Sequence, residues 1–139
     1  MGQSIKQNTD GSAGLAGPGG GDGEFVVVSL AFGDAAGVDI GLFIASRRYI
    51  VKSVIGRVEA QAAGATAGVN ATASGTSISG GNKCHASTIA LDGAIRTNQV
   101  MTINTDGTEI IEAGSCLGVN FTGTTTGAVG TISVTLCPA

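Results

Sequence analysis

Short apolar runs, separated by glycine- and threonine-rich turns, follow one another from residue 24 to the end of the chain. The clearest pattern lies in residues 128–137, where Ile132, Val134 and Leu136 occupy one face and hydroxyl side chains occupy the other. A period of two residues is typical of a strand with one buried and one solvated face. The chain is therefore predicted to be all-β and antiparallel.

The pattern predicts roughly seven to nine short strands, at the spacing of an antiparallel sandwich or barrel. The predicted strands cover residues 24–32, 40–45, 49–60, 84–91, 99–104, 110–111, 116–121 and 128–137, with weaker candidates at 68–73 and 76–79. A phase shift near Gly56 predicts a bulge or a bend. The last two runs are predicted to pair as a hairpin. The best helix candidate, 87–97, is short and contains Gly93.

Residues 1–23 differ from the rest, because they end in a glycine-rich run with neither periodicity nor bulky side chains. We predict a flexible N-terminal arm over 1–23, disordered alone or extended along another surface, and a single β-sandwich domain over 24–139. The glycine run is not a phosphate-binding loop, since it lacks the Gly-Lys-Ser/Thr ending and follows no strand.

Charge is scarce: 12% of residues are charged and the net charge is −3. This argues against nucleic acid as a partner, because phosphate binding needs clustered Lys and Arg. No apolar run approaches the roughly 20 residues of a membrane span. Residues 1–10 are polar and lack the features of a signal peptide, so we expect synthesis in a cytoplasm. The core is rich in Ala and Val, which favours stabilisation through self-association.

Groups for catalysis or metal binding are few. His85 is the single histidine, and it follows Cys84; neighbouring strand residues point to opposite faces, so these two cannot act together. We expect His85 to be a surface or interface residue. The acidic residues considered are expected to be solvated acids at turns and strand ends: Asp34, Asp39, Glu109 and Glu112. The sequence thus predicts no enzyme, no cofactor and no metal site.

The three cysteines are Cys84, Cys116 and Cys137. Their odd number does not fit a framework of disulfides, and their spacing does not fit a metal site. A disulfide between Cys116 and Cys137 is conceivable if their strands are neighbours. The favoured interpretation is three reduced, partly buried thiols.

Arg47, Arg48, Lys52 and Arg57 form one basic group in the sequence. On a regular strand Arg57 would share a face with Tyr49, and Lys52 would lie on the other side. Two interpretations stay open: these residues protect a sheet edge from pairing or are simply solvated, or they contact an acidic partner.

Two segments carry a family resemblance. Residues 43–51 contain the pattern F-x-A-x-R-x-Y-x-V, followed by a Gly/Ala/Thr-rich stretch. Residues 111–138 contain A-G-S-x-L-x-V-x-F-x-G-T, a glycine-rich link and a last strand ending in L-x-P. Over residues 43–138 the chain resembles the capsid decoration (cement) proteins of tailed bacteriophages. Ser115 departs from the pattern, which usually has Asp there.

The resemblance implies a jelly-roll-like β-sandwich that forms a homotrimer on the outside of a phage capsid. The partners would be the major capsid protein and further copies of the chain. The protein would be made in the host bacterial cytoplasm and located in the virion. We expect the capsid contacts to include Lys6, Leu15, Arg47, Arg48 and Arg57.

Two other classes of function remain. A head-fibre, spike-base or tail-associated phage protein would have the same composition. A carbohydrate-binding sandwich is disfavoured, because such sites use exposed aromatic side chains and the chain has no Trp and one Tyr.

Overall fold

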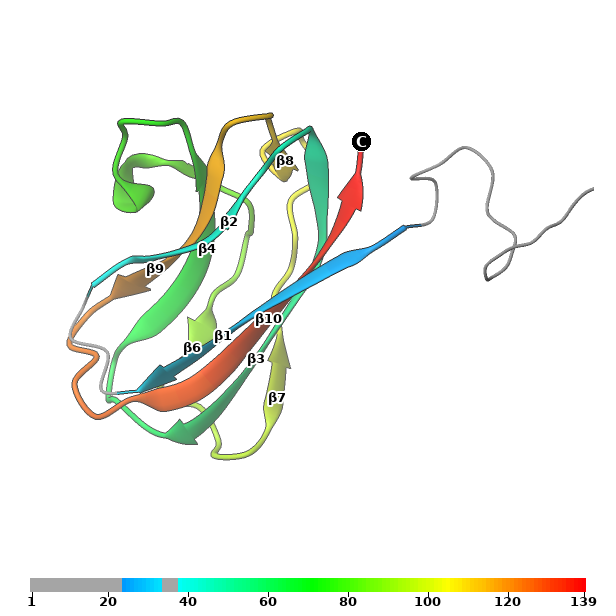
Figure 1. Ribbon diagram of the computed structural model, residues 1–139. Coiled ribbons are helices and arrows are strands. Elements are labelled where there is room, and N and C mark those ends of the chain that lie inside the picture. The colour runs from blue at the N-terminus through cyan, green and yellow to red at the C-terminus, as the bar shows by residue number, and fades with distance from the viewer. Residues whose placement is uncertain (1–23, 34–37) are drawn as a thin grey trace, which may run out of the picture.

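The computed structural model describes residues 24–33 and 38–139, which form two antiparallel β-sheets packed face to face (Figure 1). The strands are β1 (Val26–Gly33), β2 (Ile40–Ile44), β3 (Tyr49–Ala60), β4 (Thr66–Thr72), β5 (Asn82–Lys83), β6 (Ile89–Ala90), β7 (Asn98–Val100), β8 (Ile110–Ile111), β9 (Cys116–Thr122) and β10 (Val129–Pro138). The first sheet has the order β1-β10-β3-β7, and β8 also pairs with β3. The second has the order β2-β9-β4-β5, and β6 also pairs with β4.

The strands pair from the two ends of the chain inward. β1 pairs with β10, β2 pairs with β9, β3 pairs with β7 and β8, and β4 pairs with β5 and β6. The chain is thus a long antiparallel ribbon folded back on itself and wrapped into two layers, which is the jelly-roll arrangement. The predicted all-β, jelly-roll-like sandwich is confirmed.

The predicted hairpin of the last two strands is wrong, because β9 and β10 belong to different sheets. Their buried faces were predicted correctly: Leu117 and Val119 on β9, and Ile132 and Val134 on β10, are fully buried. The inward side chains of both strands enter the same core. The alternation of apolar and polar residues therefore identifies which residues are buried, but not which strand each one pairs with. The link between β9 and β10 therefore crosses from one sheet to the other.

The segment between β4 and β8 was predicted least well. Residues 76–79 form turns and the start of a short 3-10 helix, Ile78–Gly80, and no helix forms over 87–97. The expected strand 84–91 is broken, with an isolated bridge from His85 to Ile103. The side chain of Gln99 accepts a hydrogen bond from the amide of Ala90 and donates one to its carbonyl, both at 2.8 Å. The side chain of Gln99 thus takes the place of a neighbouring strand's backbone at Ala90.

The predicted bulge in β3 occurs, but at Lys52 instead of Gly56. Its register against β10 skips Lys52, and a second shift skips Glu59. The extra residue at Lys52 changes which side chains point inward, so Tyr49 is buried whereas Arg57 is exposed. The predicted shared face of Tyr49 and Arg57 is therefore wrong. Gly56 has another role, since a Cβ there would lie 2.8 Å from Ile89.

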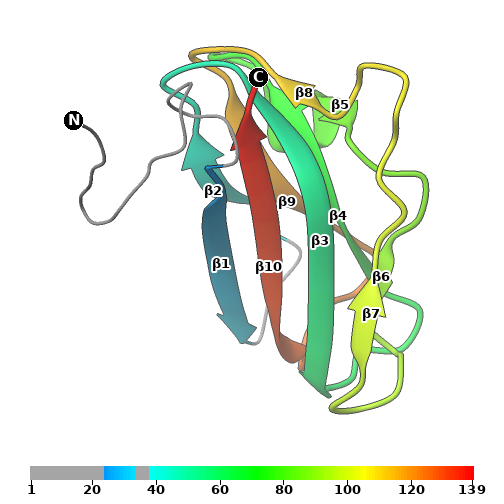
Figure 2. The same ribbon diagram turned by 90° about the vertical axis from the view of Figure 1, so that its right-hand side faces the viewer.

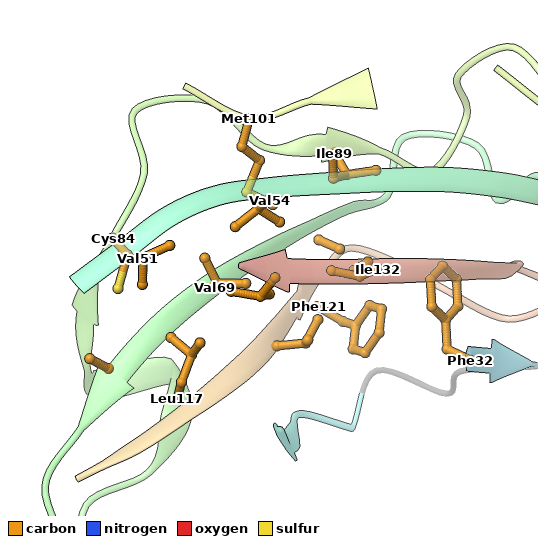
Figure 3. Packing of buried hydrophobic residues seen from close by; sticks show 14 of the residues in the cluster. Phe32, Val51, Val54, Val69, Cys84, Ile89, Met101, Leu117, Phe121 and Ile132 are labelled. Atoms are coloured by element: carbon orange, nitrogen blue, oxygen red, sulfur yellow. The ribbon is translucent and has the colours of Figure 1, made fainter. Parts of the chain in front are cut away.

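The core lies between the sheets, as Figure 3 shows. Val54 and Ile132 of the first sheet point toward Val69 and Leu117 of the second, and all four are fully buried. The Phe32 and Phe121 rings also meet across the sheets, with centroids 5.4 Å apart in an edge-to-face arrangement. Burial of these side chains holds the two layers together.

Candidate interaction surfaces

The outer face of the second sheet is covered by the protein's own chain. Residues 73–86, which we call the covering segment, join β4 to β5 and continue past it. Within this segment Ile78 lies against Gly118 of β9, where a Cβ would be 2.5 Å away. The side-chain amide of Asn70, on β4, donates to the carbonyl of Ile78 at 2.8 Å. The covering segment therefore hides part of this outer face, whereas Ile44 on β2 remains 74% exposed.

His85 belongs to the covering segment and is buried, with 7% of its surface exposed. The sequence-based expectation of a surface or interface residue is thus wrong: the imidazole packs on Gly68, which has no side chain to occupy that space. Its Nδ1 has no hydrogen-bond partner among the described residues. Burial, and then the charge of Lys83, lower the pKa of His85. The neutral imidazole is the form that the fold favours.

Cys84 lies on the other side of the backbone, in the core, and burial raises the pKa of its thiol to about 12. The prediction that Cys84 and His85 cannot act together is confirmed. Cys116 and Cys137 are half-buried free thiols on strands of different sheets. The conceivable disulfide between them is therefore absent, and the interpretation as three thiols is confirmed.

The outer face of the first sheet has no covering segment among the described residues. Figure 2 looks onto this sheet, with β1, β10, β3 and β7 side by side. Its exposed apolar side chains include Val27 on β1, Ile55 on β3 and Val100 on β7, at 63%, 40% and 69% exposure. Short hydroxyl side chains lie between them, and the Ser29 and Ser133 hydroxyls are 2.9 Å apart. We call this surface the bare face.

The bare face contains a shallow hollow of about 390 Å³ lined by residues of β3, β7 and β10. Its charged side chain is Arg57, whose Nε lies 2.7 Å from a carboxylate oxygen of Glu59. Arg96 pairs with the same carboxylate at 3.1 Å. Two arginine side chains thus share one carboxylate, which leaves one net positive charge beside the hollow.

The basic residues do not gather into the predicted group. Arg47 and Arg48 lie in the exposed turn between β2 and β3, and Arg48 pairs with Glu112 at 3.5 Å. Arg57 lies nine residues further along β3, about 30 Å away at the rise of an extended strand. Lys6 and Leu15 lie outside the described residues. Capsid contact by these five candidates stays a prediction.

The carboxylates serve local structure. Asp39, before β2, accepts hydrogen bonds from the Asn120 side chain at 3.0 and 3.2 Å and from the Phe121 amide at 3.0 Å. It therefore joins two strands of the second sheet, a role the sequence analysis missed. A carboxylate oxygen of Glu109 accepts from the Gly107 amide at 2.7 Å, and Glu112 is exposed. Asp34 lies outside the described residues.

Asp106 occupies the turn before β8. The hydroxyl of Thr108, and then its backbone amide, donate to this carboxylate and lower its pKa. Across residues 24–33 and 38–139, no three His, Cys, Asp or Glu side chains are grouped as a metal site would require. The same part of the chain has no helix long and apolar enough to cross a membrane.

Comparison with known proteins shows likeness at the level of fold. The sequence matches no protein-family model and no curated protein. The structure is similar to a chain of the cyanophage Pam1 capsid asymmetric unit, with a TM-score of 0.51 and 19% sequence identity. The match covers 97% of this chain and 100% of that chain. The two chains thus share a fold.

Proposed function

We propose that the chain is a structural protein of a bacteriophage virion, which binds the outside of the capsid as a homotrimer and cements neighbouring capsomers. The observation that carries this proposal is the full-length likeness to a chain of the cyanophage Pam1 capsid asymmetric unit. It agrees with the decoration-protein resemblance of residues 43–138, which independently implied a jelly roll.

The surfaces of the molecule fit a role in binding. The bare face is apolar and hydroxyl-rich with little net charge, and such a surface can be buried against protein without leaving unpaired charges. Arg47 and Arg48 are exposed at the opposite end of β3 from Arg57, where they can contact acidic groups of the shell. The trimer would bridge adjacent major capsid subunits after head expansion. Because it binds only the assembled lattice, mass action would stabilise the shell.

Residues 1–23 would add contacts with neighbouring subunits. Several weak contacts on one tether raise the effective concentration of each, so an arm can strengthen attachment without altering the domain. Deletion of residues 2–23 should then weaken capsid binding while the domain remains folded. Unchanged occupancy of the capsid by the truncated chain would contradict this part of the proposal.

The decisive experiment uses expanded capsids assembled without this chain. The purified full-length protein is added, the particles are sedimented, and bound protein is located by cryo-electron microscopy. We expect threefold density at lattice positions between capsomers. Absence of binding would overturn the proposal. Density confined to a vertex or tail would instead assign the chain to the head-fibre, spike-base or tail-associated proteins.

A further inference from the structure

β1 is an edge strand that lacks the usual protection against pairing. It has eight residues, it pairs with β10 without a register shift, and it contains neither charge nor proline. The other edges in the described part of the chain are protected: β5, β6 and β8 have two residues each, β7 has three, and β2 has five with a register shift. Sheet edges in soluble proteins are normally shortened, bulged or charged in this way, because their free amides and carbonyls accept another strand.

The side chains of β1 also remain incompletely covered. Val26, Val28 and Leu30 point toward the core but are only half-buried. Their partners on β10, namely Leu136, Val134 and Ile132, are fully buried. The difference arises because, within residues 24–33 and 38–139, β1 has a neighbouring strand on one side only. A strand added beyond β1 would remove this remaining apolar surface from water.

The outward residues of β1 become smaller along the strand, in the order Val27, Ser29, Ala31, Gly33. If two copies of β1 pair antiparallel with Ser29 opposite Ser29, Val27 meets Ala31 of the second copy. On the inner side Val28 meets Leu30 of the second copy. Large outward residues are thus opposite small ones, and apolar inner residues are opposite apolar ones. The strand is complementary to itself in size and chemistry.

We propose that the free edge of β1 pairs with β1 of a second copy of this chain, with Ser29 at a twofold axis. The two first sheets then become one continuous sheet. Such a contact uses the same surface on both molecules, so it closes after joining two units. Neighbouring threefold positions on a hexagonal lattice are related by twofold axes, so this contact could link one trimer to the next. The pairing does not depend on the proposed function and is measured without a capsid.

The first test compares two exposed valines at opposite edges of the first sheet. Val27→Lys places a charge on β1, and Val100→Lys places the same charge on β7, from starting exposures of 63% and 69%. Mass is measured by light scattering over a range of concentrations, and folding is checked by circular dichroism. We expect the wild-type mass to rise with concentration to at least twice that of the starting unit. A monomer has one β1 edge and stops at a dimer, whereas a trimer has three such edges and can join further trimers.

Val27→Lys should lower the association constant by roughly tenfold or more, because it removes two valine contacts from the pair, one from each copy. Val100→Lys should leave the association constant unchanged. A wild-type mass that never doubles would overturn the proposal. Equal weakening by the two folded variants would also overturn it, since the association would then involve the whole bare face and not the β1 edge.

The register is tested by cross-linking under mild oxidation with oxidised glutathione. Two copies of Ser29→Cys at the twofold axis would lie within the Cα separation of a disulfide. Thr131→Cys, on β10 and opposite Ala31, is the matched control one strand away. We expect disulfide-linked dimers from Ser29→Cys alone, above the background that the natural thiols give in wild type. Equal cross-linking by both variants would exclude the proposed register.

Discussion

The imidazole of His85 rests directly on Gly68, and no space remains between them for a side-chain methyl group. This contact holds the end of the covering segment against the second sheet. Gly68 lies between Ala67 and Val69, whose side chains are fully buried in the core, so its own outward position is the one that His85 occupies. The glycine is required by its neighbour and not by its backbone conformation.

Gly68→Ala should therefore destabilise the fold by about 1–3 kcal/mol, the usual cost of an extra methyl group in a packed site. The free energy of unfolding is measured by urea denaturation. Gly33→Ala is the control, because a Cβ at Gly33 meets no atom of the described residues within 4 Å. Equal losses from the two substitutions would show that the contact with His85 is not the cause.

Stability should fall as the pH is lowered below about 6.5. Burial lowers the pKa of His85 in the folded protein, so in this range the unfolded chain binds more protons than the folded one. Lowering the pH therefore favours unfolding, and stability is fully retained above the unfolded pKa. Urea denaturation between pH 8 and pH 5 measures this dependence. His85→Gln should flatten the curve; an unchanged slope in that variant would assign the dependence to other groups.

Asp39→Ala should destabilise the second sheet by about 1–3 kcal/mol, because the Phe121 amide and the Asn120 side chain both lose their acceptor. Asp39→Asn retains an acceptor oxygen and should cost less. Thermal unfolding of the two variants and of Asn120→Ala, with the double variant Asp39→Ala/Asn120→Ala, gives the coupling between the residues. Additive losses would mean that their hydrogen bond contributes nothing.

The three thiols should differ in reactivity toward a thiol reagent such as DTNB. Cys116 and Cys137 are half-buried, whereas Cys84 is fully buried with a pKa raised to about 12. The thiolate is the reactive form, so we expect two thiols to react in the native protein and the third only in urea. Reaction of all three at one rate under native conditions would contradict the burial of Cys84.

The sequence predicted the long strands well, because burial repeats every second residue in them. The range predicted for β3 is the range observed, and the inward residues of β9 and β10 were identified. The pairing of β9 and β10 was not predictable in this way, since inward residues of both sheets enter one core. The bulge at Lys52 was misplaced because a register skip depends on the opposite strand, β10.

The surfaces were harder to predict than the core. Nothing in the sequence around His85 shows that it packs on Gly68, because the two residues meet only after β4 and the covering segment are placed together. Asp39 likewise acts on residues more than 80 positions away. The basic residues looked like a group because they are close in sequence, yet β3 is extended and separates them. The roles of these residues thus depend on where the fold places them and not on their neighbours in the sequence.

The pairing of the first strand with the last has a consequence for synthesis. Ser29 meets its partner Ser133 across 104 residues of chain. At translation rates of about 5–20 residues per second, the partner residues on β10 are made roughly 5 to 20 s after those on β1. Such distant pairing also makes closure of the fold slow. During this interval β1, an apolar strand, lacks the strand it pairs with, so newly made chains are most prone to aggregate while they are still on the ribosome.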